Sequence, residues 1–194
     1  MRTATDNVPI FPLSMVLFPE GVLSLRVFET RYLDMISRCL KDDVPFGICM
    51  ITEGSEVGLA ASCYQMGTLA KIVNWDQAPD GVLNIEVLGC QRFNILQRDV
   101  ASNELTTAVI QILDETTLTR IPEELSDLTH MLKRAISKQQ PNLLIDDEQF
   151  NDANWVSYRL TEILPIENIM RQRLLEIEDP IDRLQMVLGL FTKR

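Results

Sequence analysis

The chain has 194 residues, of which 46% are hydrophobic and 24% charged, and its net charge is −10 at pH 7. This composition is typical of a soluble globular protein with one large domain or two small ones. The acidic balance argues against binding to nucleic acid or to anionic membranes, because both need a cationic surface. The sequence offers neither a bilayer-spanning apolar run nor a secretory apolar core, so we expect a cytoplasmic protein.

The cysteines and the single histidine argue against a metal site. Cys39, Cys49, Cys63 and Cys90 are widely and irregularly spaced, and His130 is far from all of them. A zinc site needs clustered ligands at short spacing. We therefore predict no metal and no cofactor, and expect four buried thiols in a reducing compartment.

The first half of the chain, residues 8 to about 113, has mostly the patterns of strands. The exception is a helix predicted over residues 29–41, where apolar residues recur at helical spacing. Ile36 and Leu40 lie on its predicted apolar face, and Arg31 lies on the opposite, charged face.

The clearest strand signals lie in the middle of the chain. A strand is predicted over residues 66–73, followed by a loop that contains Trp75 and the Pro-Asp-Gly turn at residues 79–81. Proline sets the backbone angle early in such a turn, and glycine accepts the positive φ at its end.

Three further strands are predicted beyond this turn: residues 83–87, a returning strand through Phe93 and Ile95, and residues 105–113. Residues 83–87 alternate between apolar and polar side chains, which is the pattern of a half-buried strand. Gly89 and Cys90 fit a two-residue hairpin, and residues 105–113 form a strand rich in Thr, Val and Ile. Several short strands joined by tight turns indicate a barrel or pseudo-barrel.

Residues 121–194 have mostly the patterns of helices. An apolar face on the first helix runs through Leu125, Leu128, Leu132 and Ile136. Helix starts are predicted at Pro122, at Asn151 or Asp152, at Pro165, and at Asp179-Pro180, because Asp and Asn cap helices and Pro favours the first turn.

Six features in this order resemble the N-terminal, substrate-binding domain of Lon-type ATP-dependent proteases, over about residues 8–193. They are an apolar strand, a Phe-Pro-x-Gly corner, a Gly-Thr-x-Ala strand, a Pro-Asp-Gly turn, a Val-x-Gly-x-x-Arg-Phe segment and the two proline helix starts near the carboxyl end. These occur here at 9–13, 18–21, 66–70, 79–81, 87–93, 164–165 and 179–180.

The resemblance implies an α+β fold, with a PUA-like β pseudo-barrel followed by a C-terminal helical bundle. The barrel subdomain is expected over residues 1–115, with its helix at about 29–41. The helical subdomain is expected over residues 116–194, and the two together form one Lon N-terminal-type domain. The implied function is recognition or presentation of unfolded or partner polypeptides, with a protease or ATPase acting in trans.

The same resemblance implies no catalytic residue in this region. The sequence contains no G-x-x-x-x-G-K-[ST] phosphate loop, which excludes ATP hydrolysis of that type. The chain ends at Arg194, where the ATPase and protease domains of Lon would begin, so it resembles stand-alone Lon-domain proteins. Ser37 and Lys41 are four residues apart on the predicted helix, but an amphipathic surface helix does not supply the desolvated lysine that a catalytic dyad needs.

Polypeptide binding needs an exposed apolar patch, in which methionine adapts to varied partners and aromatic residues anchor them. The candidates are Met15, Phe18, Tyr64, Met66 and Trp75. Phe18 and Met66 could equally belong to the core, whereas the polar neighbours of Trp75 predict that it is exposed. Two alternatives stay open: an RNA-binding PUA-like protein, and an enzyme with an unrecognised site. The sequence does not predict the oligomeric state.

Overall fold

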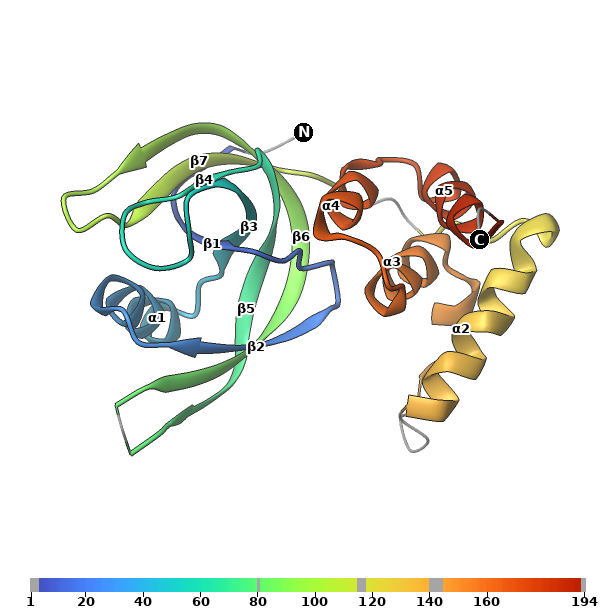
Figure 1. Cartoon of the computed structure of the whole chain (residues 1–194), viewed down its shortest axis with the longest axis horizontal. Helices are drawn as coiled ribbons and strands as arrows, with labels where there is room; N and C mark the ends of the chain where they lie inside the picture. The colour runs from blue at the N-terminus through green and yellow to red at the C-terminus, as the bar shows by residue number, and fades with distance from the viewer. Residues whose placement is uncertain (1–3, 80, 115–117, 140–144, 193–194) are drawn as a thin grey trace. The chain divides into compact units, whose positions relative to one another are not determined.

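The computed structural model describes residues 4–79, 81–114, 118–139 and 145–192, which fall into two compact units, unit 1 (Met1–Glu115) and unit 2 (Thr116–Arg194) (Figure 1). Unit 1 contains β1 (Ala4–Leu13), β2 (Val22–Val27), α1 (Thr30–Asp42), β3 (Phe46–Glu53), β4 (Ser62–Cys63), β5 (Met66–Gln77), β6 (Leu83–Val100) and β7 (Thr106–Ile112). Unit 2 contains η1 (Glu123–Leu125), α2 (Ser126–Gln139), η2 (Gln149–Asn151), α3 (Ala153–Ile163), α4 (Asn168–Glu176) and α5 (Pro180–Thr192). Within the described ranges, no helix is both long and apolar enough to cross a bilayer.

The strands of unit 1 form one large, mostly antiparallel sheet that closes on itself. Its order is β1-β7-β6-β5-β3-β4, and β1 also pairs in parallel with β3, which completes a ring. Closure is tight at Gly47, where a Cβ atom would lie 2.6 Å from Ile10 Cδ1 and 2.7 Å from Phe93 Cζ. Ile10 and Phe93 are fully buried there. The small residue therefore allows the interior of the ring to be filled by large apolar side chains.

Strand β6 corrects one prediction, because it runs without a break through Gly89 and Cys90 where a hairpin was expected. Its first part pairs with β5 and β2, and its second part pairs with β5 and β7. Gly89 is needed for close approach and not for a turn. Its N–H donates to Gly21 O at 2.8 Å, and a Cβ on it would collide with the carbonyl oxygen of Phe18.

The turn between β5 and β6 lies where the sequence predicts it. Ala78 N donates to Val82 O at 2.9 Å, Gly81 N donates to Ala78 O at 3.0 Å, and Gly81 has φ of +85°. Asp80 of this turn is outside the described residues. Because β5 continues to Gln77, Trp75 lies in a strand and not in the predicted loop.

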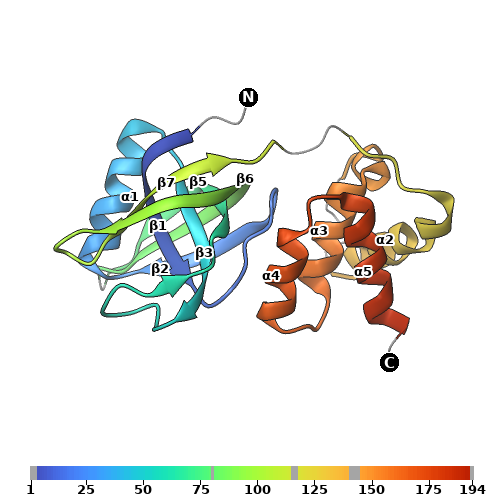
Figure 2. The ribbon, with the colours of Figure 1, turned by 90° about the horizontal axis from the view of Figure 1, so that it is seen from above.

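Helix α1 matches the predicted range and lies against the strands of unit 1 (Figure 2). Its predicted apolar face is correct at Ile36, which is buried together with Tyr32, Met35 and Cys39, but wrong at Leu40, which is 37% exposed. The predicted polar side also fails at one position, because Arg31 is buried among polar partners described below. Of the four thiols that were expected to be buried, those of Cys39, Cys49 and Cys63 are buried, and that of Cys90 is only half-buried.

Two of the four predicted helix starts in unit 2 are confirmed by a side-chain cap. The Asp152 carboxylate accepts from Asn154 N at 3.1 Å at the start of α3, and Asp179 accepts from Ile181 N at 2.7 Å at the start of α5. The start predicted at Pro122 gives only the short 3-10 turn η1 from Glu123, and α2 begins at Ser126. The predicted start at Pro165 is wrong by three residues, because α4 begins at Asn168. The predicted apolar face of α2 is correct, with Leu128 and Leu132 fully buried.

Candidate polypeptide-binding surface

The structure separates the five residues that the sequence suggests for polypeptide binding. Phe18 is fully buried and Met66 is 9% exposed, so both belong to the core of unit 1 and offer no surface. Tyr64 is half-buried. Met15 and Trp75 are 40% and 56% exposed, but they lie on different elements. The predicted set is therefore not one patch, because the closed sheet turns two of its members inward.

An exposed apolar group that the sequence analysis missed lies where β2 meets α1. Phe28 is 57% exposed, and it lies beside the loop of residues 54–61, which presents Val57 (53% exposed) and Leu59 (78% exposed). We call Phe28, Val57 and Leu59 the loop patch. The signal available in the sequence was the run of small and apolar residues after Gly54, which is unusual for a solvated loop.

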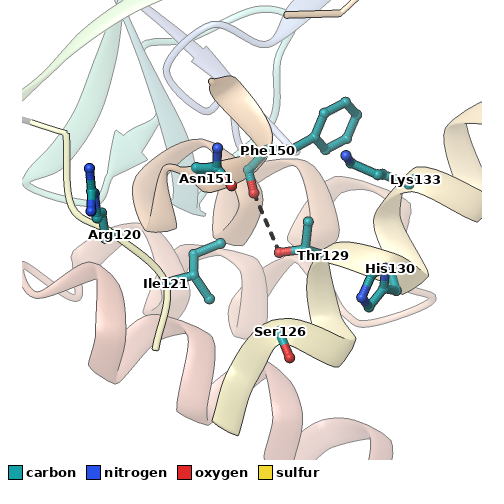
Figure 3. A pocket seen from close by; sticks show the side chains of 8 residues that line it. All are labelled: Arg120, Ile121, Ser126, Thr129, His130, Lys133, Phe150 and Asn151. Carbon is teal, nitrogen blue, oxygen red and sulfur yellow. Dashed lines mark hydrogen bonds between the residues drawn. The ribbon is translucent and has the colours of Figure 1, made fainter. Parts of the chain in front are cut away.

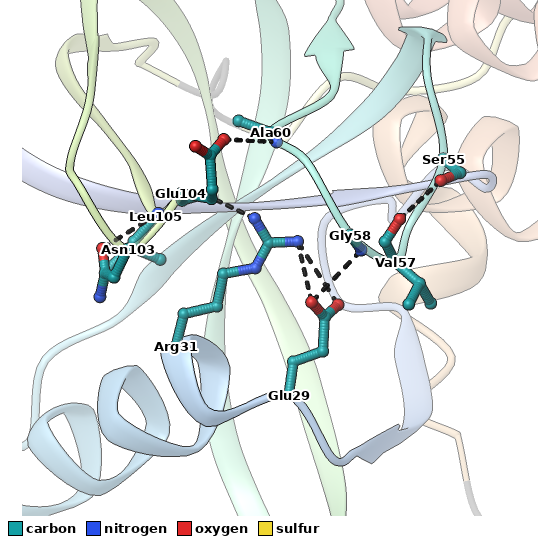
Figure 4. A network of polar contacts seen from close by, with 9 residues as sticks. All are labelled: Glu29, Arg31, Ser55, Val57, Gly58, Ala60, Asn103, Glu104 and Leu105. Atoms are coloured by element: carbon teal, nitrogen blue, oxygen red, sulfur yellow. Dashed lines mark hydrogen bonds and ion pairs between the residues drawn. The ribbon is translucent and has the colours of Figure 1, made fainter.

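Three carboxylates hold this loop in place, each by accepting a hydrogen bond from a main-chain N–H, and Figure 4 shows two of them, Glu29 and Glu104. Glu29 accepts from Gly58 N at 3.3 Å and Glu104 accepts from Ala60 N at 3.0 Å. Within the loop, Glu56 reaches out to accept from Ser14 N at 2.6 Å. Since the backbone is fixed in this way, its apolar side chains remain exposed instead of folding into the core.

A buried arginine joins two of these carboxylate residues. Arg31, 5% exposed, donates through Nη1 to the Glu104 carbonyl at 2.6 Å and forms an ion pair with Glu29 at 3.2 Å (Figure 4). Glu104 has φ of +64°, a left-handed conformation that is uncommon for glutamate. This conformation accompanies contacts from both its carbonyl and its carboxylate, so the turn before β7, α1 and the loop form one polar network.

Three depressions follow one another along β2 and the start of α1. The first, about 500 Å³, is lined by Ser24, Leu25, Arg26, Asn74, Trp75, Asp76, Asn84, Ile85 and Glu86. The second, about 40 Å³, shares Arg26 with it and adds Phe28 and Val57. The third, about 440 Å³, shares Phe28 and Glu29 with the second. We call these three adjoining depressions the β2 groove.

The β2 groove is acidic. Its lining contains six carboxylates, from Glu29, Asp34, Glu56, Asp76, Glu86 and Glu104, against the two guanidinium groups of Arg26 and Arg31. Unit 1 as a whole has fifteen acidic and eight basic residues. A groove with this lining attracts basic groups and repels anions.

Among the described residues of unit 1, two further pairs of reactive groups lie outside the β2 groove: Ser37 with Lys41, and Cys49 with Cys63. Ser37 and Lys41 are both exposed on α1, so this lysine is not desolvated. The hydrogen bond from the Cys49 thiol, aided by the nearby Arg98 guanidinium and opposed by burial, lowers the pKa of Cys63 to about 7. The same hydrogen bond, together with burial, raises the pKa of Cys49. Both thiols are buried, and neither lines the β2 groove.

Two solved structures that are similar to this one are Lon N-terminal domains. A Lon N-terminal domain protein from Xanthomonas campestris has a TM-score of 0.81 and 30% identity, covering 96% of this chain and 98% of that one. The N-terminal domain of a Mycobacterium avium complex Lon protease has a TM-score of 0.68 at 16% identity, which shows similarity of fold.

Similar sequences belong to proteins that are longer than this chain. A Lon protease of Cytophaga hutchinsonii is 26% identical over 96% of this chain, and a LON peptidase N-terminal domain and RING finger protein of Schizosaccharomyces pombe is 26% identical over 93%. The chain spans 24% and 44% of these two relatives, respectively. The model of the ATP-dependent protease La (LON) substrate-binding domain matches residues 7–193. The chain therefore belongs to the LON substrate-binding domain family.

Proposed function

We propose that this chain is a non-catalytic module that binds extended polypeptide segments along the β2 groove. The observation that carries the proposal is that the three depressions adjoin one another, since Arg26 and Phe28 each line two of them. Exposed Trp75, Phe28 and Val57 lie along it on a well-bonded backbone. Ordered apolar side chains bind a partner without first losing conformational entropy, which favours recognition.

The charge of the β2 groove determines which polypeptide segments we expect it to prefer. With six carboxylates and two arginines in its lining, it suits segments in which basic residues alternate with apolar ones. An extended chain presents successive side chains to opposite sides, so its apolar residues can contact the aromatic groups while its basic residues reach the carboxylates.

Strand β2 offers a second source of affinity. Among the described strands it pairs only with β6, so its other edge carries backbone groups that can pair with an added strand. Binding by strand addition recognises any extended backbone and leaves sequence preference to the side-chain pockets. This mode suits a module that accepts many unfolded segments.

We infer that the closed sheet of unit 1 is a PUA-like pseudo-barrel, that unit 2 is a helical bundle, and that the two form one Lon N-terminal-type domain. As a cytoplasmic adaptor, the module would present bound segments to a protease or ATPase in trans. RNA binding, which PUA-like folds also support, is disfavoured by the acidic groove.

The test is a comparison of two labelled 15-residue peptides binding to the intact chain. One alternates leucine with lysine, and the other alternates leucine with glutamate. We expect only the lysine peptide to bind, and we expect Trp75→Ser or Phe28→Ser to weaken it at least about tenfold, as for aromatic anchors in other interfaces.

The matched control is Leu96→Ser, because Leu96 on β6 is 58% exposed but does not line the groove. This variant should bind the peptide normally. Equal losses in the control and the groove variants, or absence of peptide binding at high micromolar concentration, would refute the proposal. Tight, salt-sensitive binding of RNA to the same groove would favour the alternative.

A further inference from the structure

Unit 2 contains a separate cavity of about 460 Å³ whose chemistry is opposite to that of the β2 groove (Figure 3). It lies between α2, η2 and the segment before η1. Its lining is Arg120, Ile121, Ser126, Thr129, His130, Lys133, Phe150 and Asn151. The lining has two cationic side chains and no carboxylate, although acidic residues outnumber basic ones by 28 to 18 in the chain. Such a lining favours an anionic ligand.

The cavity also has an apolar component, which makes it more than a site for a bare anion. Phe150 and Ile121 provide its apolar surface, and Lys133 Nζ lies 4.6 Å from the centre of the Phe150 ring (Figure 3). Thr129 and Asn151 add groups that can form hydrogen bonds. A ligand that matches this lining carries a carboxylate close to an apolar side chain.

The chain itself shows that Lys133 can pair with a carboxylate. Asp147 lies 3.1 Å from Lys133 Nζ, and its side chain is 91% exposed while that of Lys133 is 43% exposed. An ion pair this exposed contributes little stability and exchanges readily with another partner. A carboxylate of a bound segment can therefore replace Asp147 on Lys133 at small cost to the fold.

We propose that this cavity is a second binding site, specific for acidic polypeptide segments. One carboxylate of the segment pairs with Lys133 and a second pairs with Arg120, and an apolar side chain between them packs against the apolar part of the lining. The proposal goes beyond the function of the β2 groove and does not depend on it. Together the two sites would let one module hold chains of opposite local charge.

The test uses the intact chain and calorimetric titration with a short peptide that alternates aspartate with phenylalanine. The asparagine–phenylalanine peptide is the uncharged comparison, and it should not bind. Lys133→Gln and Arg120→Gln should each weaken the aspartate peptide several-fold. Asp147→Asn should have the opposite effect and tighten binding by up to about fivefold, the range for exposed charge pairs. If the Lys133–Asp147 ion pair had only a structural role, the two substitutions would not change the affinity for the peptide in opposite directions.

A matched ion pair in unit 1 provides the control. Lys71 and Asp43 lie 3.1 Å apart with side chains 51% and 80% exposed, so Lys71→Gln and Asp43→Asn change the net charge identically at a similar site. Neither should change the affinity for the peptide. Equal effects of the two pairs would mean that only overall charge matters and would overturn the proposal. Absence of peptide binding, or displacement of the peptide by millimolar inorganic phosphate or by a short RNA, would overturn it as well.

Discussion

The buried guanidinium of Arg31, at the start of α1, donates a 2.6 Å hydrogen bond to the main-chain carbonyl of Glu104, in the turn before β7. The same side chain pairs with Glu29 and lies 4.5 Å from the centre of the Tyr32 ring. Because Glu29 and Glu104 in turn bind main-chain groups of residues 54–61, Arg31 indirectly positions the loop patch.

Replacing Arg31 by methionine should therefore affect both stability and the loop. We expect the free energy of unfolding to fall by about 2–3 kcal/mol, the usual loss for hydrogen bonds to a charged group. The amides of Gly58 and Ala60 should exchange faster in NMR measurements, because the carboxylates that accept from them lose their support. Arg38→Met is the control, since Arg38 bonds only at 3.3 Å to Asp34 O on the exposed side of α1. Equal amide exchange in the two variants would contradict this role of Arg31.

Glycine positions in the two units should respond oppositely to alanine. Gly89→Ala should destabilise unit 1 by about 1–3 kcal/mol, because the new Cβ would overlap the Phe18 carbonyl. Gly189→Ala should stabilise unit 2 by about 0.5–1 kcal/mol, since this helical position has open space and alanine favours helix. Chemical denaturation measures both changes. If Gly89→Ala left the stability unchanged, the backbone around Phe18 would have to move aside easily, which would contradict the prediction.

The core of unit 2 depends on a fully buried arginine. Arg183 donates to Leu174 O at 3.1 Å, to Ile177 O at 2.6 Å and to Ser157 Oγ at 3.1 Å, and its guanidinium lies 4.0 Å from the centre of the Tyr158 ring. Arg183→Lys should cost at least about 2 kcal/mol, because a lysine cannot reproduce the planar set of donors. Thermal unfolding checks this, and a lysine variant as stable as the parent would contradict it.

Glu162 should make the stability of unit 2 depend on pH. Burial raises the pKa of this carboxyl to about 7, although Arg159 and Arg171 lower it. Between pH 4.5 and 7 the folded state then binds more protons than the unfolded state, so this group lowers stability as the pH rises through that window. Glu162→Gln should gain stability relative to the parent on going from pH 5 to pH 8. Fluorescence of Trp155 in a Trp75→Phe background reports unfolding of unit 2. If the stabilities of the parent and of Glu162→Gln changed in parallel with pH, the raised pKa of Glu162 would be contradicted.

Features set by neighbouring residues could be predicted from the sequence. The helix predicted over residues 29–41 is α1 at Thr30–Asp42, and the strand predicted at 105–113 is β7 at Thr106–Ile112. The capping role predicted for Asp179 is confirmed because a cap involves only the adjacent turn. Such signals are local in the chain and survive folding.

Features that depend on contacts between distant residues could not be predicted from the sequence. Gly89 has the sequence signature of a turn, but the approach of the Phe18 carbonyl explains it. Arg31 resembles a solvated helix residue until Glu104 is brought to it by the turn before β7. For the candidate site, the exposure of Trp75 was predictable from its polar neighbours, whereas the loop patch depends on carboxylates from three segments. The run of small and apolar residues after Gly54 marks this loop as unusual, but no local pattern shows which carboxylates hold it.

The β2 groove is the site at which we propose that an extended polypeptide binds. The most direct measurement is hydrogen exchange of the intact chain, followed by mass spectrometry, with and without the saturating leucine–lysine peptide. We predict added protection in β2 and in residues 54–61, with no change in the part of β6 around Leu96. Protection confined to other segments, or none in unit 1 despite bound peptide, would contradict the claim.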